Sequence, residues 1–445
     1  MTRTVYTFLL YLILPFTPLK LWWRGRKQPE YLQHWHERYG FYAKNNLHLT
    51  EISKTNISTS KIIKPVIWLH CVSVGETRAA APLVKALFQQ YPQHQILLTH
   101  TTTTGRATSE QLFGNTISSV YLPYDVPFAV KRFLNHFKPV IGILMETELW
   151  FNLIAGCKRE NIPILLVNAR LSEKSAIGYA KLGRLVNEGL QNLSAIAVQT
   201  LEDAARLQKL GANHLTVTGN LKFDVQPPQE AFVEGEHLRA LIGVNRKVLL
   251  AASTRDGEEA IILDAVASIA DLITIIVPRH PQRFNDVEAL LQQRGLNYQK
   301  RSNLNTNHSN TKIDEHTQYI LGDSMGELFT YYAACDVALI GGSLLPFGGQ
   351  NLIEAAVMGK PVLIGPHTYN FTDVTKAAVL AGAALQLQKT DELREKIEYL
   401  FKSKLVREQM GEAGLRFTEA SMGATAKVMD LISIHLTAPE NLTTP

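Results

Sequence analysis

Short runs of apolar residues, separated by stretches with helical spacing, recur along almost the whole chain and constrain its fold more than any other feature. In the first half these runs begin at Val66, Gln95, Val140, Pro163, Ala195 and Leu215. The runs are apolar almost throughout, which is typical of parallel strands covered by helices on both faces. The segments between them, such as AAAPLVKALFQQ after Glu76, space their apolar residues three and four positions apart. This alternation predicts repeated β-α-β units around a parallel sheet.

The alternation stops between Lys222 and His237 and then starts again. The interruption, KFDVQPPQEAFVEGEH, is polar and contains two adjacent prolines, so we interpret it as a linker. Further apolar runs begin at Lys247, Ile273, Tyr319, Asp336 and Pro361. A chain of 445 residues is long enough for two domains with separate cores. We therefore predict an α/β protein with two Rossmann-like, doubly wound domains, residues 28–225 and 237–445, facing each other across a cleft. Residues 226–236 form the linker, and the last helix is free to pack back on the first domain.

The N-terminal segment differs in composition from the rest of the chain. An apolar run from Val5 to Leu19 is followed by Trp22, Trp23 and several basic residues. A signal peptide would end in small residues instead. Because a full membrane span needs about 20 apolar residues, a short span, an interfacial helix and a buried core helix all remain open. The tryptophans and arginines favour a membrane anchor over residues 1–27, and the basic cluster predicts that the body stays in the cytoplasm.

Composition excludes several kinds of site. The three cysteines lie far apart, and the histidines show no ligand spacing, so we predict neither a disulfide framework nor a metal. Ser73 lacks the preceding glycine of a nucleophile elbow. The net charge of +5 weakly favours anionic partners such as nucleotides, phosphorylated lipids or a membrane surface. No basic stripe is interleaved with aromatic residues, so nucleic acid is not expected as a partner.

Polar residues and glycines stand where the predicted strands end. They are Glu76, Glu146, Glu148, Asn168, Arg170, Ser253, Thr254, Arg255, Pro278, Arg279 and His280. Ligands of doubly wound sheets bind at the carboxyl ends of the strands, and with two domains the cleft between them is the expected site. The glycine-rich stretch LIGGSLLPFGGQNLIEAA opens a helix near Asn351 and could present backbone N–H groups to an anion. Each residue alone is also explained as a turn or a cap, but their recurrence in both halves predicts a binding edge.

The chain contains, in this order, VSVGET, LPYD, METELW, NARLS, GNLKFD, VPRHP, GDSMGEL, GGSL followed by GGQNLIEAA, and GPHTYNF. In these motifs it resembles the 3-deoxy-D-manno-octulosonic acid (Kdo) transferases of Gram-negative bacteria, from the N-terminal apolar run to beyond Phe371. The resemblance implies a GT-B glycosyltransferase with a single N-terminal anchor in the cell inner membrane and a catalytic body on the cytoplasmic face. It implies transfer of Kdo from CMP-Kdo to the lipid A precursor (lipid IVA) in lipopolysaccharide core biosynthesis, with no cofactor. Phe151 and Leu352 stand where many relatives have proline.

The resemblance also implies roles for individual residues. Glu76 matches the family's general base, which takes the proton of the acceptor hydroxyl, and Gly75 is expected to form the turn that aims it. From the residues alone, Glu76 could equally be a first-turn carboxylate that complements the helix dipole. The residues that match donor-binding segments are Pro278, Arg279, Met325, Gly326, Glu327, Asn351, Leu352, Ile353 and Glu354. The residues that could shape the acceptor side, or serve only as structural partners, are Glu146, Glu148, Asn168 and Arg170.

Two other functions fit the same pattern. One is a GT-B enzyme that uses another nucleotide sugar, and the other is a membrane-tethered module that binds a nucleotide without turnover. The chain has no D-x-D pair, the motif with which many glycosyltransferases hold a metal and a sugar diphosphate. Its absence favours a donor with less phosphate to neutralise, and the resemblance implies an inverting transfer that needs no metal. The partners expected are CMP-Kdo, the lipid A precursor and inner-membrane lipids, and the motifs are shared by members that add one, two or several Kdo residues.

Overall fold

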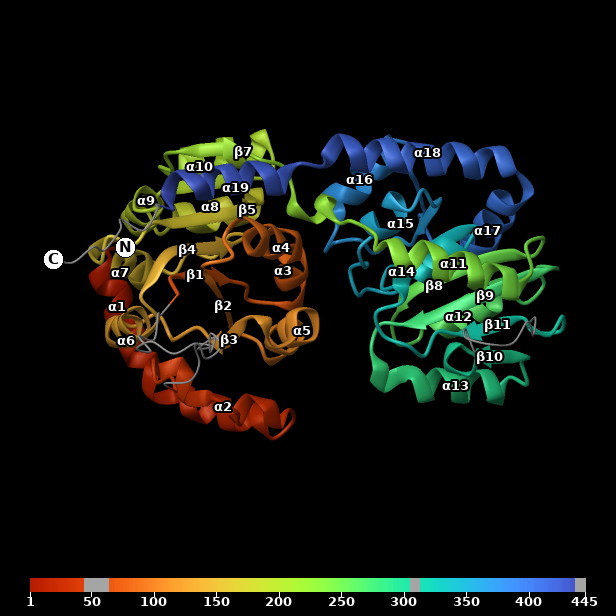
Figure 1. Ribbon diagram of the computed structural model, residues 1–445, viewed down its shortest axis with the longest axis horizontal. Helices are drawn as coiled ribbons and strands as arrows, with labels where there is room; N and C mark the ends of the chain where they lie inside the picture. Colours follow the sequence, from red (N-terminus) through yellow and green to blue (C-terminus); the bar gives the residue numbers. More distant parts are fainter. Residues whose placement is uncertain (44–63, 305–312, 437–445) are drawn as a thin grey trace, which may run out of the picture. The chain divides into compact units, whose positions relative to one another are not determined.

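The computed structural model describes residues 1–43, 64–304 and 313–436 (Figure 1). The chain forms two compact units, one made of Met1–Asp224 with Met422–Pro445 and the other of Val225–Ser421. Each unit contains one seven-stranded sheet, and every strand pair in both sheets is parallel. The prediction of two doubly wound α/β domains is confirmed.

The sheet of the first unit has the order β3-β2-β1-β4-β5-β6-β7. Its strands are β1 (Val66–His70), β2 (Gln95–His100), β3 (Ser118–Tyr121), β4 (Pro139–Met145), β5 (Ile164–Ala169), β6 (Ala195–Val198) and β7 (Leu215–Val217). The direction of strand addition reverses between β1 and β4, and this switch point is where ligands of doubly wound sheets bind.

Helices cover both faces of this sheet. Ile67 and Leu69 point to one face, where they pack against α3, α4 and α19, whereas Val66 and Trp68 point to the other, against α6, α7, α9 and α10. The helices of the unit's body are α3 (Val74–Ala79), α4 (Ala81–Gln90), α5 (Thr103–Phe113), α6 (Pro127–Phe137), α7 (Phe151–Arg159), α8 (Glu173–Ala180), α9 (Arg184–Gln191), α10 (Leu201–Lys209) and α19 (Ala424–His435). Burial of β1 on both faces explains why its residues are apolar without alternation.

The last helix, α19, belongs to the first unit although it ends the described chain. Its side chains Val428, Met429 and Ile432 lie in the same core cluster as strand β1. The carboxylate of Asp224, at the end of the short helix η5 (Leu221–Asp224), accepts the N–H of Gly423 at 2.7 Å and also that of Thr425. Asp224 thereby holds the point where the chain returns to the first unit.

The sheet of the second unit has the order β10-β11-β9-β8-β12-β13-β14. Its strands are β8 (Lys247–Thr254), β9 (Leu272–Pro278), β10 (Tyr298–Lys300), β11 (Tyr319–Leu321), β12 (Val337–Ile340), β13 (Val362–Ile364) and β14 (Ala384–Gln386). Its helices are α11 (Gln229–Ile242), α12 (Glu258–Val266), α13 (Phe284–Gln293), α14 (Leu328–Ala334), α15 (Ile353–Val357), α16 (Thr372–Leu380), α17 (Leu393–Lys402) and α18 (Lys404–Ser421). α11, α14 and α15 cover one face, and α12, α13 and α17 cover the other.

The N-terminal helices rest on the first unit. Helix α1 (Arg3–Ile13), a 3-10 turn and α2 (Thr17–Gly25) follow one another. Together, Arg3–Gly25 form a helical stretch of 23 residues that is long and apolar enough to cross a membrane, and 6% of its apolar window is buried. This low burial contradicts the reading of the segment as a buried core helix.

Three details differ from the expectations drawn from the sequence. Most of the predicted linker is helical, because α11 begins at Gln229 and packs its apolar residues Leu238 and Ile242 against the second sheet. Gly75 does not form a turn: it lies inside α3 and is not among the residues with positive φ. Strands β3, β10 and β14 were not expected, and all of them are short and occupy sheet edges.

Candidate active site

Glu76 lies at the carboxyl end of the central strand β1. The chain leaves the strand at His70, turns in extended conformation at Ser73 and enters α3, whose third residue is Glu76. One carboxylate oxygen of Glu76 accepts the N–H of Val72 at 2.6 Å, and the other accepts the hydroxyl of Ser73 at 3.1 Å. The Ser-x-x-Glu spacing is that of a capping box, but Ser73 caps no helix N–H, and Glu76 accepts the N–H of Val72 instead of that of Ser73. The two hydrogen bonds hold the Glu76 side chain back over the start of its own helix.

Two further carboxylates act on Glu76. Burial raises the pKa of Glu76 to about 8, with smaller contributions from Glu146 and Glu148, against the opposing hydrogen bonds from Val72 and Ser73. Burial likewise raises the pKa of Glu148 to about 7, and Glu146 adds to this. A cap alone would favour the ionised carboxylate. The raised pKa therefore marks Glu76 as a group that exchanges a proton near neutral pH.

Glu146 reaches this cluster from the end of β4. Its backbone is in the left-handed region, with φ of 56°, and its carboxylate pairs with Lys222 at 3.7 Å. Such a conformation is uncommon outside glycine and is typical of turns and functional sites. Glu146, Glu148 and Glu76 thus belong to one electrostatic cluster, as the position of their strands at the switch point predicts.

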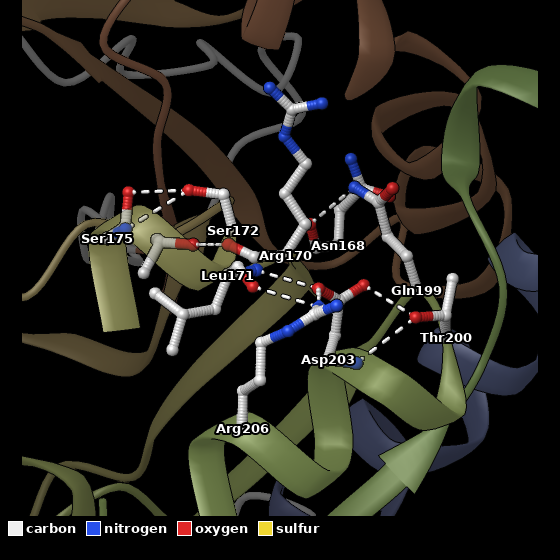
Figure 2. A network of polar contacts seen from close by, with 10 residues as sticks. Asn168, Arg170, Leu171, Ser172, Ser175, Gln199, Thr200, Asp203 and Arg206 are labelled. Atoms are coloured by element: carbon white, nitrogen blue, oxygen red, sulfur yellow. Dashed lines mark hydrogen bonds and ion pairs between the residues drawn. The ribbon is translucent and has the colours of Figure 1, made fainter. Parts of the chain in front are cut away.

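Asn168 and Arg170 have different environments at the end of β5 (Figure 2). Asn168 is fully buried; its Oδ1 accepts the N–H of Leu221 at 3.0 Å, and its carbonyl accepts Nε2 of Gln199 at 2.9 Å. These contacts tie β5 to η5 and to the end of β6, which is a structural role. The Arg170 side chain is exposed and extends away from the labelled network in Figure 2, so its guanidinium is accessible from solvent.

Asp203 organises the remainder of the network in Figure 2. It accepts the N–H of Leu171 at 2.8 Å and the hydroxyl of Thr200 at 2.9 Å, and it pairs with Arg206 at 3.2 Å. The loop after β5, which carries Arg170, is therefore anchored to the first turn of α10. Asp203 was not singled out in the sequence, where it reads as an ordinary first-turn acid.

In the second unit, Glu258 organises the binding edge. It is fully buried, and its two oxygens accept the N–H groups of Arg255 at 2.8 Å, Gly342 at 2.6 Å and Leu344 at 2.8 Å. Burial raises its pKa, and hydrogen bonds from backbone N–H groups, those of Gly342, Arg255 and Leu344 among them, oppose that shift. Glu258 joins the loop after β8 to the glycine-rich loop after β12. The sequence shows this residue only as the first of two adjacent acids at a helix start.

The glycine-rich loop needs its glycines for two different reasons. Gly342, Gly348 and Gly349 have φ of 67°, 92° and 78°, which favours glycine. A Cβ on Gly341 would lie 2.4 Å from the carbonyl oxygen of Ser253, so no side chain fits between the ends of β12 and β8. The loop is therefore shaped by its own backbone and by Glu258.

The segment from Asn351 to Glu354 presents only its ends to solvent. The Oδ1 of Asn351 accepts the N–H of Ile353 at 3.2 Å, and its Nδ2 donates to Glu354 at 3.2 Å. Leu352 and Ile353 are fully buried in the core. The helix begins at Ile353, close to Asn351 as expected, and has five residues. So short a helix carries a small dipole, and the expectation of a helix end that binds an anion is weakened.

Three guanidinium groups gather at the ends of β8 and β9. Arg255 contacts His280 through Nη1 and Nε2 at 3.0 Å. Burial lowers the pKa of His280, and Arg255, Arg279 and Arg283 lower it further. Arg283 also pairs with Glu259 at 2.6 Å. Arginine is well suited to phosphate, so this edge has the charge that a nucleotide phosphate requires, and Arg255 adds to the predicted Arg279.

The predicted donor segment Met325–Glu327 lies just before α14. Met325 is 44% exposed, and Gly326 has φ of 86° with nothing within 4 Å of an added Cβ. The carboxylate of Glu327 pairs with the buried Arg301 at 2.7 Å. Met325 and Gly326 are thus free to contact a ligand through their backbone, whereas the Glu327 side chain already has a cationic partner. Pro278, at the end of β9, is buried.

Comparison with known proteins gives two family matches. The family 3-Deoxy-D-manno-octulosonic-acid transferase (kdotransferase) matches residues 33–225, and Glycosyl transferases group 1 matches residues 295–417. A 3-deoxy-D-manno-octulosonic acid transferase from Bordetella pertussis is 42% identical over 378 residues, which is 82% of this chain and 86% of the relative. The protein of that name from Haemophilus influenzae is 37% identical over 443 residues, 98% of this chain and 99% of the relative.

Solved structures share the fold at lower identity. A glycosyltransferase from Rickettsia africae matches with a TM-score of 0.54 at 14% identity, covering 84% of this chain and 99% of that one. The complex of S. aureus MnaA with UDP matches with a TM-score of 0.53 at 16% identity, covering 84% and 98%. The GT-B-type fold expected from the sequence is therefore confirmed.

Proposed function

The chain belongs to the 3-deoxy-D-manno-octulosonic acid transferase family of lipopolysaccharide biosynthesis, and we propose that it transfers Kdo from CMP-Kdo to the lipid A precursor, with inversion and without a metal ion. The observation that carries this mechanism is the buried, doubly hydrogen-bonded Glu76, whose pKa is raised to about 8. A carboxylate with that pKa is a suitable base near neutral pH.

Glu76 acts on the acceptor in this mechanism. A sugar hydroxyl of the lipid attacks the anomeric carbon of Kdo, and the new carbon–oxygen bond forms as the bond to the CMP phosphate breaks. The hydroxyl proton passes to the carboxylate of Glu76, and the electron pair of the broken bond leaves with CMP. The hydrogen bonds from Val72 and Ser73 hold the carboxylate in one orientation, which lowers the entropic cost of reaching the transition state.

The second unit binds the nucleotide in this proposal. The guanidinium groups of Arg255 and Arg279 stabilise the negative charge on the phosphate as CMP leaves. Glu354, held by Asn351, accepts hydrogen bonds from the ribose hydroxyls, and the exposed backbone at Met325 and Gly326 contacts the base. The buried Leu352 and Ile353 support this edge from the core.

We propose that the N-terminal helices lie in the plane of the membrane surface. The Tyr6 hydroxyl donates to Asp125 at 2.8 Å, and that of Thr7 donates to Asn152 at 2.9 Å, so one face of α1 is bound to the protein body. Phe8 and Leu12 are exposed on the rest of α1, and Phe16, Leu19, Trp22 and Trp23 are exposed on the 3-10 turn and α2 that follow. A helix that is polar towards the protein and apolar towards solvent is typical of interfacial anchoring.

The test is turnover with CMP-Kdo and a lipid A precursor, with products weighed by mass spectrometry. We expect the acceptor to gain one or more Kdo masses, and this gain to be lost in Glu76→Gln but kept in Glu230→Gln. Glu230 is an exposed first-turn acid of α11 and serves as the matched control. Transfer only from a uridine-diphosphate sugar would indicate another GT-B specificity, and CMP binding without any product would indicate a nucleotide-binding module.

A further inference from the structure

A pocket of about 220 Å³ in the first unit lies beside the carboxyl ends of β2 and β3. Helix α2 forms one wall, and the loops after the two strands form the other. Three cations line the pocket, Lys20 and Arg24 from α2 and Arg38 from the 3-10 helix at Trp35–Tyr39. Its remaining lining residues are Thr17, Leu21, Tyr31, Thr101, Thr102, Leu122, Pro123, Tyr124 and Trp150.

None of the three cations is paired with a carboxylate within residues 1–43, 64–304 and 313–436. Arg38 is 5% exposed, donates through Nη2 to the carbonyl of Thr101 at 3.0 Å and stacks on Tyr121 at 4.0 Å. Its Nε is buried and has no hydrogen-bond partner among the described residues. A buried charge without a counter-ion is costly, so the pocket is suited to an anion.

Two other features favour an anion at the same place. Thr102 caps the start of α5, an eleven-residue helix whose N-terminal end adds positive potential. Burial raises the pKa of Tyr124, and Arg38 and Arg24 oppose that shift, so both guanidinium groups act on this hydroxyl. Hydroxyl groups and arginines together are the usual ligands of a phosphate.

The pocket shares a structural element with the carboxylate of Glu76. The Thr102 hydroxyl, which lines the pocket, donates to the carbonyl of Val72 at 2.9 Å. The N–H of Val72 in turn donates to the carboxylate of Glu76 at 2.6 Å. Trp150, which lines the pocket, lies 6.0 Å from His70 between ring centroids. A lipid bound here is therefore next to the group proposed as the base.

We propose that this pocket binds a phosphate monoester on the lipid acceptor and so positions its sugar hydroxyl at Glu76. The inference rests on the proposed function, in which the acceptor is a lipid. The position of the pocket favours the acceptor over other sources of phosphate, because α2 carries the apolar residues Trp22 and Trp23 beside Lys20 and Arg24. The ligand's acyl chains would then lie along the exposed apolar face of α1 and α2.

The test compares the phosphorylated acceptor with the same lipid after phosphatase treatment, both in neutral detergent micelles. Wild type is expected to prefer the phosphorylated lipid roughly ten- to a hundredfold in kcat/KM. Lys20 and Arg24 are exposed. The double variant Lys20→Gln with Arg24→Gln is expected to lose this preference for the phosphorylated lipid, while its KM for CMP-Kdo stays unchanged. The matched control is Arg26→Gln with Lys27→Gln, which removes the same charge from residues that stack on Trp22 and Trp23.

Direct binding keeps the proposal separate from the proposed activity. Quenching of tryptophan fluorescence measures binding of both lipids, of inorganic phosphate and of phosphatidic acid vesicles to the full-length protein. Tighter binding of the phosphorylated acceptor that depends on Lys20 and Arg24 supports the pocket even without turnover. The proposal would be overturned if the two double variants had equal effects on binding of the phosphorylated acceptor, or if the Lys20 and Arg24 variant lost only vesicle binding. Binding of free phosphate as tight as that of the lipid would also overturn it.

Discussion

Glu76 has the features of both readings that the sequence presents as alternatives, a first-turn acid and a candidate base. It lies in the first turn of α3, and it accepts the N–H of Val72 and the hydroxyl of Ser73, which precede the helix. It is also buried beside two other acids, which raises its pKa to about 8. The two hydrogen bonds explain its orientation, and the burial explains how a carboxylate at this position could take a proton near neutral pH.

Replacement of Glu76 should separate catalysis from stability. Glu76→Gln keeps the side-chain size but removes the basic oxygen pair, so we expect turnover to fall by about two orders of magnitude or more.

The raised pKa of Glu76 also affects stability, because the folded state retains a proton that the unfolded state loses between about pH 4.5 and 8. The free energy of unfolding contributed by this group therefore decreases as pH rises through that window. At pH 8 the melting temperature of the Gln variant should be no lower than that of wild type. Calorimetry checks this, and a variant that is inactive because it is unfolded would contradict the expectation.

The same pKa predicts a pH profile. We expect kcat/KM to rise about tenfold per pH unit below pH 8 and then to level off, because only ionised Glu76 acts as a base. Glu148→Gln removes one neighbouring negative charge, so the midpoint of this rise should move to lower pH. Glu160→Gln, on the exposed end of α7, should leave it in place. A midpoint that is the same in all three proteins would argue against Glu76 as the titrating group.

At the scale of elements, each sheet presents candidate binding residues on loops that are held by a buried carboxylate. Asp203 holds the loop after β5, and Glu258 holds the loops after β8 and β12. In both cases the acid satisfies backbone N–H groups that would otherwise be buried without partners. The exposed Arg170 and the partly buried Arg255 are carried on the loops so held.

Loss of the Glu258 carboxylate should loosen the donor edge. Glu258→Ala leaves three buried N–H groups without their acceptor, and each such group costs about 1–3 kcal/mol. We expect a clear fall in the free energy of unfolding of the second unit, measured by urea titration, and weaker CMP binding. Glu234→Ala, an exposed position on α11, is the control. Wild-type stability in Glu258→Ala would mean that the loops do not depend on it.

The cations at the ends of β8 and β9 give a second prediction at this scale. Arg279→Ala removes a charge-assisted contact to the nucleotide phosphate, which corresponds to roughly ten- to a hundredfold in CMP affinity. Titration calorimetry measures this loss, and Arg416→Ala, exposed on α18, should bind CMP as wild type does. Unchanged affinity in Arg279→Ala would place the nucleotide elsewhere.

At the scale of the whole molecule, the proposed role of the N-terminal helices is to hold the protein at the membrane that carries its lipid substrate. We expect replacement of Phe8, Phe16 and Leu19 by serine to abolish sedimentation with liposomes without lowering the melting temperature, because these side chains are exposed by 62%, 67% and 62%. Ile177→Ser with Leu201→Ser removes exposed apolar surface elsewhere on the first unit and should sediment as wild type does.

The side of the membrane on which the N-terminus lies distinguishes an in-plane N-terminal helix from a spanning one. The native cysteines Cys71, Cys157 and Cys335 are all buried, so a cysteine introduced by Thr2→Cys is the position that an impermeant maleimide would label. In vesicles with the body outside, the in-plane helix predicts labelling of this cysteine from outside. Protection until the membrane is broken would show that the segment spans.

The sequence by itself predicted most of the fold, because strands buried on both faces must be apolar along their whole length. It did not predict β3, β10 and β14, because short edge strands have fewer neighbours to bury and carry no continuous apolar run. The place of Glu76 at a strand end was also evident, since the carboxyl ends of parallel strands share one edge.

What only the tertiary structure decided is the set of distances between residues far apart in the chain. The raised pKa of Glu76 depends on burial and on Glu146 and Glu148, and no local pattern encodes that proximity. The capture of three backbone N–H groups by Glu258, and the return of α19 to the first sheet, likewise depend on how separate elements meet. Periodicity records which side of an element is buried, whereas electrostatics and hydrogen bonds depend on the partners that packing brings within a few ångströms.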